Sequence, residues 1–396
     1  MVSSARLLPA EEVNLEEAQG RVVVAQVRSR DDVPPFDNSA MDGFAVRAAD
    51  TMGAEPGGPA VLHLAGTSRA GAPATSALGR GEAFAISTGA MMPAEADAVI
   101  RVEDARSDEH RVEVLSPVQP GTDIRRAGED IRAGEELIRP GTRLGPAELG
   151  VLASVGVARV SCSRRPQAAI LTTGDELTAP DQPLRPGAIR DSNAYSVPAL
   201  ARTAGCAVSV VSGVRDDRDA TVEALRTALD ADLVVICGGV SVGEHDHVKD
   251  ALATLGVEER FWGVALRPGR PTWFGVASES VRPPTLVFGL PGNPVSALVT
   301  FRLLVLPAIG VMSGLRNQRP TRLRAVMDDR YEKQPGRLHA VRCTLELRND
   351  GWHASTTGPQ GSHILTSMLG ADGLAMIEAD RGTVEAGEPV EVELLD

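Results

Sequence analysis

Aromatic residues, lysine and cysteine are all scarce in this 396-residue chain. Aromatic residues make up 3% of it, and only Lys249 and Lys333 among its 40 basic residues are lysines. This excess of arginine indicates a composition bias, so an arginine in place of an expected lysine carries little information by itself. The four cysteines lie far apart with no CxxC pair, which argues against a disulfide framework or a zinc knuckle and favours reduced core thiols.

Positive charge and long apolar segments are also limited. The net charge of −13 argues against a protein that binds nucleic acid or a membrane surface. The longest apolar stretch, near Leu298–Met312, contains Arg302 and Pro307, and we expect it to fall short of a membrane span. The N-terminal residues include no apolar segment typical of a signal peptide, so we expect a cytoplasmic protein.

The central part of the chain alternates apolar runs with polar loops. The runs AAIL, AVSVVS, DLVVIC and TLVFGL lie between Ala168 and Leu298 and suit strands buried on both faces of a parallel sheet. Loops of glycine, hydroxyl and acidic residues follow them at 172–176, 213–217, 237–246 and 289–296. The expected helices are Ser196–Ala204, Ala220–Asp230, His247–Leu255 and Pro294–Ile309. Right-handed crossovers would place all four loops at one edge of the sheet, where ligands bind.

Short β-rich runs flank this α/β segment on both sides. From Asp31 to about Glu135 they alternate with Gly, Pro and Ala turns, which predicts a small antiparallel domain. After Pro320 the same pattern returns and predicts a small β-barrel. At roughly 100–200 residues per domain, the length predicts two to four domains. The fold class is therefore multidomain, with α/β and β parts.

Acidic residues and glycines follow the predicted strands. Glu176, Asp216 and Asp246 each come just after a different strand, and three carboxylates in one crevice would favour Mg²⁺. Capping of helix N-termini explains any one of them about equally well. The glycine-rich loop Cys237–Gly243 precedes a helix and suits an anion, although a structural turn is the alternative.

Twelve motifs in a fixed order carry a family resemblance. They are VPPFDNSAMDGFAVR (33–47), STGAMMP (87–93), RRAGED (125–130), PGTRLGPAEL (140–149), TTGDEL (172–177), IRDSN (189–193), GVRDD (213–217), GGVSVGEHDHVKDAL (238–252), LRPGRP (266–271), GLPGNPVSALVTF (289–301), GRLHAVR (336–342) and TGPQGSHIL (357–365). With these motifs the chain resembles the molybdopterin molybdenumtransferases, the family of the MoeA proteins and the gephyrin E domain. The motifs span nearly the whole chain.

The resemblance implies an elongated homodimer whose central doubly wound α/β domain binds molybdopterin. The implied domains are a linking dimerisation domain (1–28 and 135–163), a β-rich insertion domain (29–134), the α/β domain (164–317) and a C-terminal β-barrel (318–396). The implied reaction inserts molybdate into adenylylated molybdopterin and releases AMP, with Mg²⁺ as cofactor. The site would combine the α/β and C-terminal domains of one subunit with the β-rich domain of the other.

Motif positions assign the site residues that the family would use. The catalytic residues would be Asp42, Asp130, Glu176, Asp216 and Asp246, with Glu176 and Asp246 as metal ligands. The substrate-binding residues would be Thr88, Gly238, Gly239, Ser241, Gly243, Lys249, Pro291, Gly292, Asn293, Pro294 and Ser296. Molybdate would be bound by Arg267, Pro268, Arg270, Arg337 and Ser362. Gly263, Arg267 and Arg270 stand where many members have lysines, and Gly263 removes a positive charge there.

Electrostatics divides these residues into two subsites. A unit charge pair at about 4 Å is worth ~4 kcal/mol at an effective dielectric constant near 20, so a molybdate dianion beside one bare carboxylate would be repelled by roughly 8 kcal/mol. We therefore expect the acids to hold Mg²⁺ beside the substrate phosphates. The arginines, whose guanidinium groups suit a tetrahedral oxyanion, would hold molybdate.

Two other functions remain open at this point. The chain could adenylylate molybdopterin, or it could be a non-catalytic dimeric scaffold of the same fold, which Gly263 mildly favours. Partners implied by the resemblance are an upstream adenylyltransferase and recipient molybdoenzymes. The sequence does not choose between molybdate and tungstate.

Overall fold

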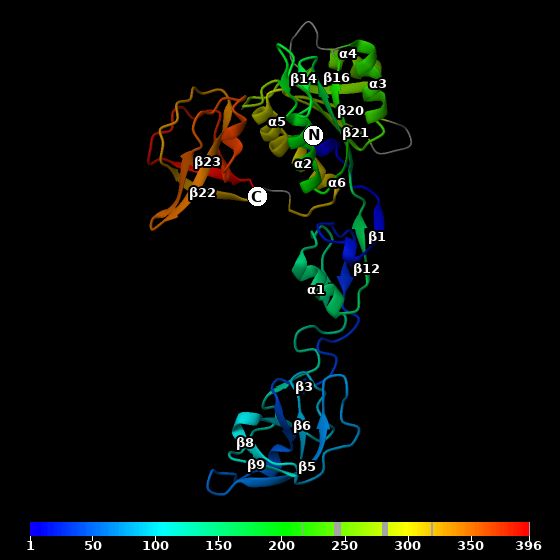
Figure 1. Ribbon diagram of the computed structural model, residues 1–396, viewed down its shortest axis with the longest axis vertical. Coiled ribbons are helices and arrows are strands. Elements are labelled where there is room, and N and C mark those ends of the chain that lie inside the picture. The colour runs from blue at the N-terminus through cyan, green and yellow to red at the C-terminus, as the bar shows by residue number, and fades with distance from the viewer. Residues whose placement is uncertain (216, 241–246, 279–283, 318–319, 396) are drawn as a thin grey trace.

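The computed structural model describes residues 1–215, 217–240, 247–278, 284–317 and 320–395. The chain is elongated (Figure 1): a β-rich lobe lies at one end of the long axis, a small connecting lobe follows, and an α/β lobe with a β-barrel beside it lies at the other end. This arrangement confirms the predicted fold class, whereas the exact domain limits stay a prediction. Asp216, Ser241, Gly243 and Asp246 lie outside the described residues.

The β-rich lobe is built on a six-stranded sheet in the order β7-β4-β6-β5-β9-β8. Its strands are β4 (Gly43–Val46), β5 (Ala60–Ser68), β6 (Glu82–Ile86), β7 (Ala98–Arg101), β8 (Ala105–Ser107) and β9 (Arg111–Val114). All pairings within it are antiparallel except β5 with β6, so the purely antiparallel expectation was wrong at that one pair. Phe44, Leu62 and Ile100 are buried in its core. Beside this sheet, β3 (Asn38–Ser39) pairs with β10 (Ile124–Arg125).

Two separate parts of the chain meet in the connecting lobe. β1 (Ala10–Asn14) pairs antiparallel with β12 (Arg159–Ser163), and β2 (Val27–Arg28) pairs with β11 (Glu136–Ile138). Helix α1 (Pro146–Ser154) buries Leu152 against these strands. Its Pro146 stands at the start of the helix, where the missing N–H costs little.

The α/β lobe contains a six-stranded sheet in the order β16-β13-β17-β21-β20-β18. The strands are β13 (Gln167–Thr173), β16 (Ala207–Val214), β17 (Leu233–Cys237), β18 (Val257–Trp262), β20 (Trp273–Ala277) and β21 (Thr285–Leu290). The first four strands in this order run parallel, as predicted, so their carboxyl ends share one edge. β20 runs antiparallel to β21, and β18 runs antiparallel to β20, so β18 points the same way as the first four strands. The sequence did not predict these two strands.

Helices cover both faces of this sheet, as Figure 1 shows. On one face pack α2 (Asn193–Thr203) and the continuous helix α5 (Pro294–Thr300), η5 (Phe301–Val305) and α6 (Leu306–Met312). On the other pack α3 (Arg218–Ala228) and α4 (His247–Thr254). Successive side chains of a strand point to opposite faces of the sheet. Ile170 therefore packs in the core on the first face, and Leu171 packs in the core on the second. The four predicted helices are all present, with ends shifted by a few residues.

Two expectations about apolar segments were wrong. The strand AVSVVS is not buried on both faces: β16 is the edge strand of the sheet, and Val210 and Val211 are exposed. The segment ending at Met312 does reach the length of a membrane span, because the helix runs through Arg302 and Pro307 as 19 continuous residues, Pro294–Met312. Within that segment 61% of its most apolar window is buried in the protein, which makes it weak evidence for a membrane helix.

Five strands of the C-terminal lobe close into a barrel. Their order is β23-β24-β22-β26-β25, and β25 pairs back with β23. The strands are β22 (Arg322–Met327), β23 (Leu338–Arg348), β24 (Gly351–Thr356), β25 (Gly373–Ile377) and β26 (Pro389–Leu394). A short strand of the α/β segment, β19 (Leu266–Arg267), pairs parallel with β23 and joins the two lobes.

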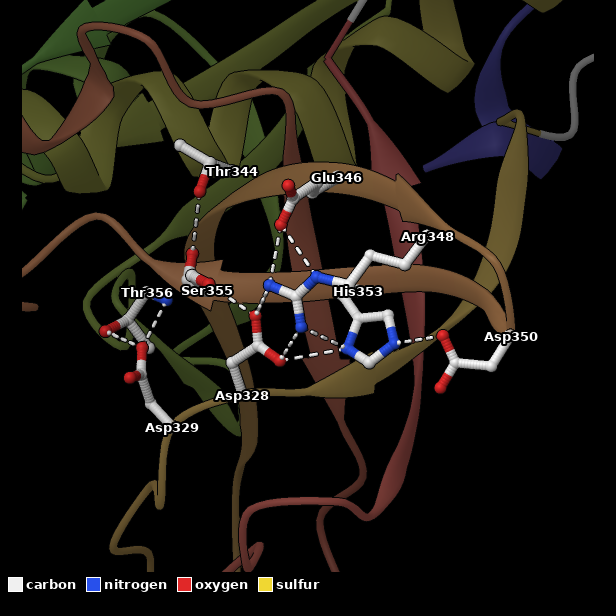
Figure 2. Close-up of polar contacts among 9 residues, drawn as sticks. All are labelled: Asp328, Asp329, Thr344, Glu346, Arg348, Asp350, His353, Ser355 and Thr356. Carbon is white, nitrogen blue, oxygen red and sulfur yellow. Dashed lines mark hydrogen bonds and ion pairs between the residues drawn. The ribbon is translucent and has the colours of Figure 1, made fainter.

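A polar cluster ties the end of β22 to the hairpin of β23 and β24 (Figure 2). Asp328 accepts hydrogen bonds from both Nη atoms of Arg348 at 2.8 and 2.9 Å and from Ser355 Oγ at 2.8 Å. His353 Nδ1 lies 2.9 Å from the Asp328 carboxylate. The Arg348 guanidinium and the imidazole lower the pKa of Asp328 to about 2, and Asp328 in turn raises the pKa of His353.

This cluster predicts how stability depends on pH. Because the pKa of Asp328 is depressed in the folded chain, its contribution is complete above the ordinary carboxyl pKa of 3.8 and is lost as pH falls through about 2. Asp328→Asn should lower Tm by about 2–4 °C at pH 7, and the gap from the unmodified chain should close between pH 4 and pH 2. Thermal melts check this, with the exposed Asp181→Asn as control. A gap that stays constant across this range would contradict the assignment.

Candidate active site

A cavity of about 710 Å³ opens at the carboxyl ends of the parallel strands. Residues from the loops after β13, β17 and β21 line it, together with the segment Ile189–Asn193 that leads into α2. Pro271 and His363 line it from the side of the C-terminal lobe. The predicted edge of the sheet is therefore the place where a cavity forms. Of the predicted site residues, those in the cavity wall are Glu176, Gly238, Gly239, Pro291, Gly292, Asn293 and Pro294.

The loop after β13 brings carboxylates to this cavity. Glu176 is exposed, and its side chain folds back over Gly174, where an added Cβ would lie only 2.5 Å from Glu176 Oε2. Glycine at position 174 leaves room for the carboxylate in this position. Asp191, which is 5% exposed, accepts hydrogen bonds from Thr172 Oγ1 at 2.5 Å and from Ala194 N at 3.0 Å. It thus caps α2 and places a second carboxylate in the wall.

The loop after β17 needs its glycines for two reasons. Gly238 and Gly239 adopt φ values of +98° and +63°, which glycine tolerates best. A Cβ on either residue would also lie about 3 Å from the Thr173 side chain, at 3.1 and 2.9 Å from Oγ1. Cys237 before them is buried, and burial raises the pKa of its thiol, so it is an inert core thiol, as expected.

The loop after β21 connects the α/β lobe with the C-terminal lobe. Asn293 Nδ2 donates to Ser362 Oγ at 3.1 Å, and Val295 N donates to the carbonyl of Ser362 at 3.1 Å. Pro294 starts helix α5, as predicted. Ser362 is therefore held at the cavity margin, next to His363 in the wall.

Positive charge gathers on the C-terminal side. The pairing of β19 with β23 sets Arg267 beside His339, two residues after Arg337. His339 is buried, and its Nδ1 forms a hydrogen bond with Tyr331 Oη at 3.0 Å. Burial lowers the pKa of His339 to about 4, and the charges of Arg267, Lys333 and Arg337 add to the effect. The arginines at 267 and 337 are both exposed, and neither is part of the cavity wall.

The remaining residues of the predicted molybdate set lie in or near the same connection. Pro268 is buried, and Arg270 is exposed immediately before Pro271 of the cavity wall. Gly263 adopts a φ of +83°, and its N–H donates to Thr272 O at 2.8 Å. The left-handed conformation gives a structural reason for glycine at a position where a lysine would be strained.

Three predicted residues are not in the cavity wall. Asp42 directly precedes β4 and Thr88 follows β6, both strands of the β-rich lobe at the opposite end of the long axis (Figure 1). Asp130 N donates to Val33 O at 3.0 Å, in the part of the chain that leads into this lobe. Asp42 and Thr88 do meet, because Thr88 N donates to Asp42 Oδ1 at 2.7 Å. Their three motif loops also converge: Gly89 N donates to Ser39 O and Ala127 N to Asp37 Oδ1, each at 2.8 Å. One chain therefore carries two separate groups of the predicted residues.

Two further predicted residues have structural roles in the described chain. Ser296 is buried in α5, where its carbonyl accepts from Thr300 Oγ1. Lys249 Nζ lies 4.7 Å from the centre of the Trp262 ring, and Trp262 Nε1 donates to Val240 O at 2.9 Å. Neither residue is part of the cavity wall.

The sequence-based prediction missed several polar residues of the wall, namely Thr172, Thr173, Arg190, Asp191, Ser192, Asn193 and His363. Asp191 and Asn193 belong to the motif IRDSN, which carried the resemblance but was assigned no role. Membership of this motif was the sequence signal that could have identified them as site residues. The acidic triad is described only in part, since Asp216 and Asp246 lie outside the described residues.

Family models match most of the chain. Residues 1–156 match the MoeA N-terminal region (domain I and II), residues 169–310 a probable molybdopterin binding domain, and residues 324–395 the MoeA C-terminal region (domain IV). These three matches agree with the motif order.

Full-length relatives give the same result. The chain is 38% identical to a molybdopterin molybdenumtransferase of Haemophilus influenzae, over 97% of this chain and 93% of that one. It is 36% identical to molybdopterin molybdenumtransferase 2 of Mycobacterium tuberculosis, over 96% and 94%. The crystal structure of the molybdopterin biosynthesis MoeA protein from Pyrococcus horikoshii OT3 superposes with a TM-score of 0.83 at 30% identity, covering 99% of this chain and 97% of that one. The chain therefore belongs to the MoeA family of molybdopterin molybdenumtransferases.

Proposed function

We propose that this chain is a molybdenum cofactor biosynthesis enzyme that inserts molybdate into adenylylated molybdopterin and releases AMP. The observation that carries the proposal is the cavity at the strand ends, which is lined by glycine loops, by the carboxylates of Glu176 and Asp191, and by Pro271 of the LRPGRP loop. The relatives whose sequences match this chain over nearly their whole length are named molybdopterin molybdenumtransferases. A soluble enzyme acting in the cytoplasm fits this role.

The described residues of the cavity offer oxygen ligands of the kind that a magnesium ion takes. Glu176 and Asp191 supply two carboxylates, and Mg²⁺ commonly takes one or two carboxylates plus substrate phosphates and waters. Glu176 would hold the ion, together with Asp246, which lies outside the described residues. No group of three or more His, Cys, Asp or Glu side chains suited to a metal occurs in the described part of the chain. When bound, the ion would neutralise charge on the substrate phosphates.

The chain's own residues would mainly bind and orient the two substrates. The N–H groups of the glycine loops and the start of α5 would hold phosphate, while Arg267, Arg270 and Arg337 with the hydroxyl of Ser362 would hold molybdate. The two dithiol sulfurs would replace one molybdate oxygen, which leaves as water with the two thiol protons, and a further water would hydrolyse the phosphoanhydride to release AMP. No covalent bond to the protein is needed. Positioning is then the enzyme's largest contribution.

A second copy of the chain would complete the site. Asp42 and Thr88 are exposed on a lobe that its own chain carries away from the cavity (Figure 1). In a homodimer, this lobe could instead reach the cavity of the partner subunit. The net charge of −13 argues against nucleic acid or a membrane surface as a partner. The proposed protein partners are an upstream adenylyltransferase and recipient molybdoenzymes.

The test is to incubate the protein with adenylylated molybdopterin, with and without molybdate, and to follow AMP. Molybdate-dependent release supports the proposal. A parallel incubation with molybdopterin and ATP separates the main rival, because only an adenylyltransferase would consume ATP. A chain that does neither would be a scaffold.

The arginine assignment gives a specific prediction. Arg337→Ala should raise the molybdate concentration needed for half-maximal activity by about 10-fold, equivalent to ~1.4 kcal/mol, because one guanidinium contact is lost. The control is Arg324→Ala, which removes an equal charge from an exposed position on β22 of the same barrel. A molybdate response equal to that of the control would remove Arg337 from the anion site.

A further inference from the structure

Two oxygen atoms in the wall of the cavity are buried without a hydrogen-bond partner. They are Thr173 Oγ1 and Asn193 Oδ1. Thr173 is 8% exposed and Asn193 is 7% exposed, and both residues line the same cavity. An unsatisfied buried polar group costs about 1–3 kcal/mol, so proteins keep few of them.

The distribution of such atoms in the described chain is informative. A third atom of this kind, Arg302 Nε, lies 3.4 Å from Glu393 Oε1 and so retains an ion pair. Within the described residues, the two buried side-chain oxygens that have neither a hydrogen bond nor an ion pair are thus both in the wall of one cavity. The neighbouring Thr172 shows the contrast, because its hydroxyl donates to Asp191 and accepts from Gly213 N at 3.0 Å.

The orientation of the Asn193 amide is fixed by its other end. Nδ2 donates to the carbonyl of Gly292 at 2.8 Å, and a flipped amide would set two oxygens against each other. The free atom is therefore an acceptor that needs an N–H or O–H donor. The buried carboxylate of Asp191, two residues away, already accepts hydrogen bonds from Thr172 Oγ1 and Ala194 N.

The two oxygens are joined by a contiguous stretch of wall. A Cβ on Gly238 would lie 3.1 Å from Thr173 Oγ1, and a Cβ on Gly292 would lie 3.7 Å from Gly238 Cα. Gly292 in turn accepts the hydrogen bond of Asn193. Both oxygens are buried, although both residues line the cavity.

We infer that Asn193 and Thr173 are specificity-determining residues that receive the N–H donors along the edge of the substrate's flat heterocycle, the pterin ring. This inference rests on the proposed function. A pterin carries an amino group and a ring N–H side by side, which matches an acceptor wall. In the free chain the two unpaired oxygens lower the free energy of unfolding, and substrate binding would remove this penalty. A ligand that lacks the N–H donors would leave both oxygens unpaired and would therefore bind more weakly.

The test separates a binding role from a purely structural one through two readouts. Thr173→Val keeps the shape of the side chain and deletes the unpaired hydroxyl, so Tm should rise while the Kd for molybdopterin increases about 10-fold. Asn193→Ala should weaken molybdopterin binding by a similar factor. Thr172→Val is the matched stability control on the same strand, and Tm should fall because its hydroxyl is paired.

Each outcome decides a different claim. If the unmodified chain binds molybdopterin and releases AMP, but Thr173→Val and Asn193→Ala bind molybdopterin as tightly as the unmodified chain, the inference is overturned and the proposed function stands. If the unmodified chain binds no molybdopterin, the inference and the proposed function both fail. A rise in Tm of Thr173→Val with unchanged Kd would show that the hydroxyl is merely an uncompensated core group, and would also overturn the inference.

Discussion

Glu176→Gln should reduce molybdate-dependent AMP release by about 100- to 1000-fold while leaving the affinity for molybdopterin nearly unchanged. The substitution preserves the size of the side chain and removes only its charge. Glu176 is exposed at the cavity and is not part of a packed core, so the fold should tolerate the change. Initial rates of AMP release and a separate titration with molybdopterin measure the two effects.

The control for this variant is Glu109→Gln, which removes the same charge from an exposed position of the β-rich lobe. Its rate should equal that of the unmodified chain. Asp246→Asn should behave like Glu176→Gln if both carboxylates hold one ion. Normal turnover in both variants would show that the metal assignment is wrong.

Mixing two inactive variants should restore activity if the site spans two subunits. Asp42→Asn disables the β-rich contribution and Glu176→Gln disables the α/β contribution, so each homodimer should be nearly inactive. Random reassociation makes half of the dimers mixed, and each mixed dimer has one intact site out of two. About a quarter of the normal activity should therefore return.

This experiment uses the separation seen within one chain (Figure 1). The matched control mixes each variant with itself under the same dissociation and reassociation conditions. Activity that stays at the level of the separate variants would mean that Asp42 and Glu176 do not serve one shared site. The β-rich lobe would then have another role.

Much of the α/β lobe could be predicted because its signals are local. Apolar runs that end at glycine and acidic loops report buried strands, and the order of strands and helices limits the topology to parallel crossovers. The glycine loop of Gly238 and Gly239 was visible in the sequence, and its positive φ values and close contacts with Thr173 favour glycine at both positions. The cavity thus formed where the sequence predicted a row of loops.

The parts that were missed depend on three-dimensional context. The run AVSVVS looks like a buried strand, but β16 ends up at the sheet edge, and no local signal distinguishes an edge strand from a central one. Thr173 is an ordinary strand residue in sequence, and its lack of a partner appears only in space. Asp191 and Asn193 become site residues because the loop that carries them folds back to the strand ends.

The most direct measurement is the stoichiometry of the reaction in a single turnover. Purified protein is loaded with adenylylated molybdopterin and given molybdate, and AMP released is compared with molybdenum bound to the pterin. We predict one AMP for each molybdenum atom inserted, and no AMP without molybdate. AMP released at the same rate in the absence of molybdate, or molybdenum inserted without AMP, would contradict the account.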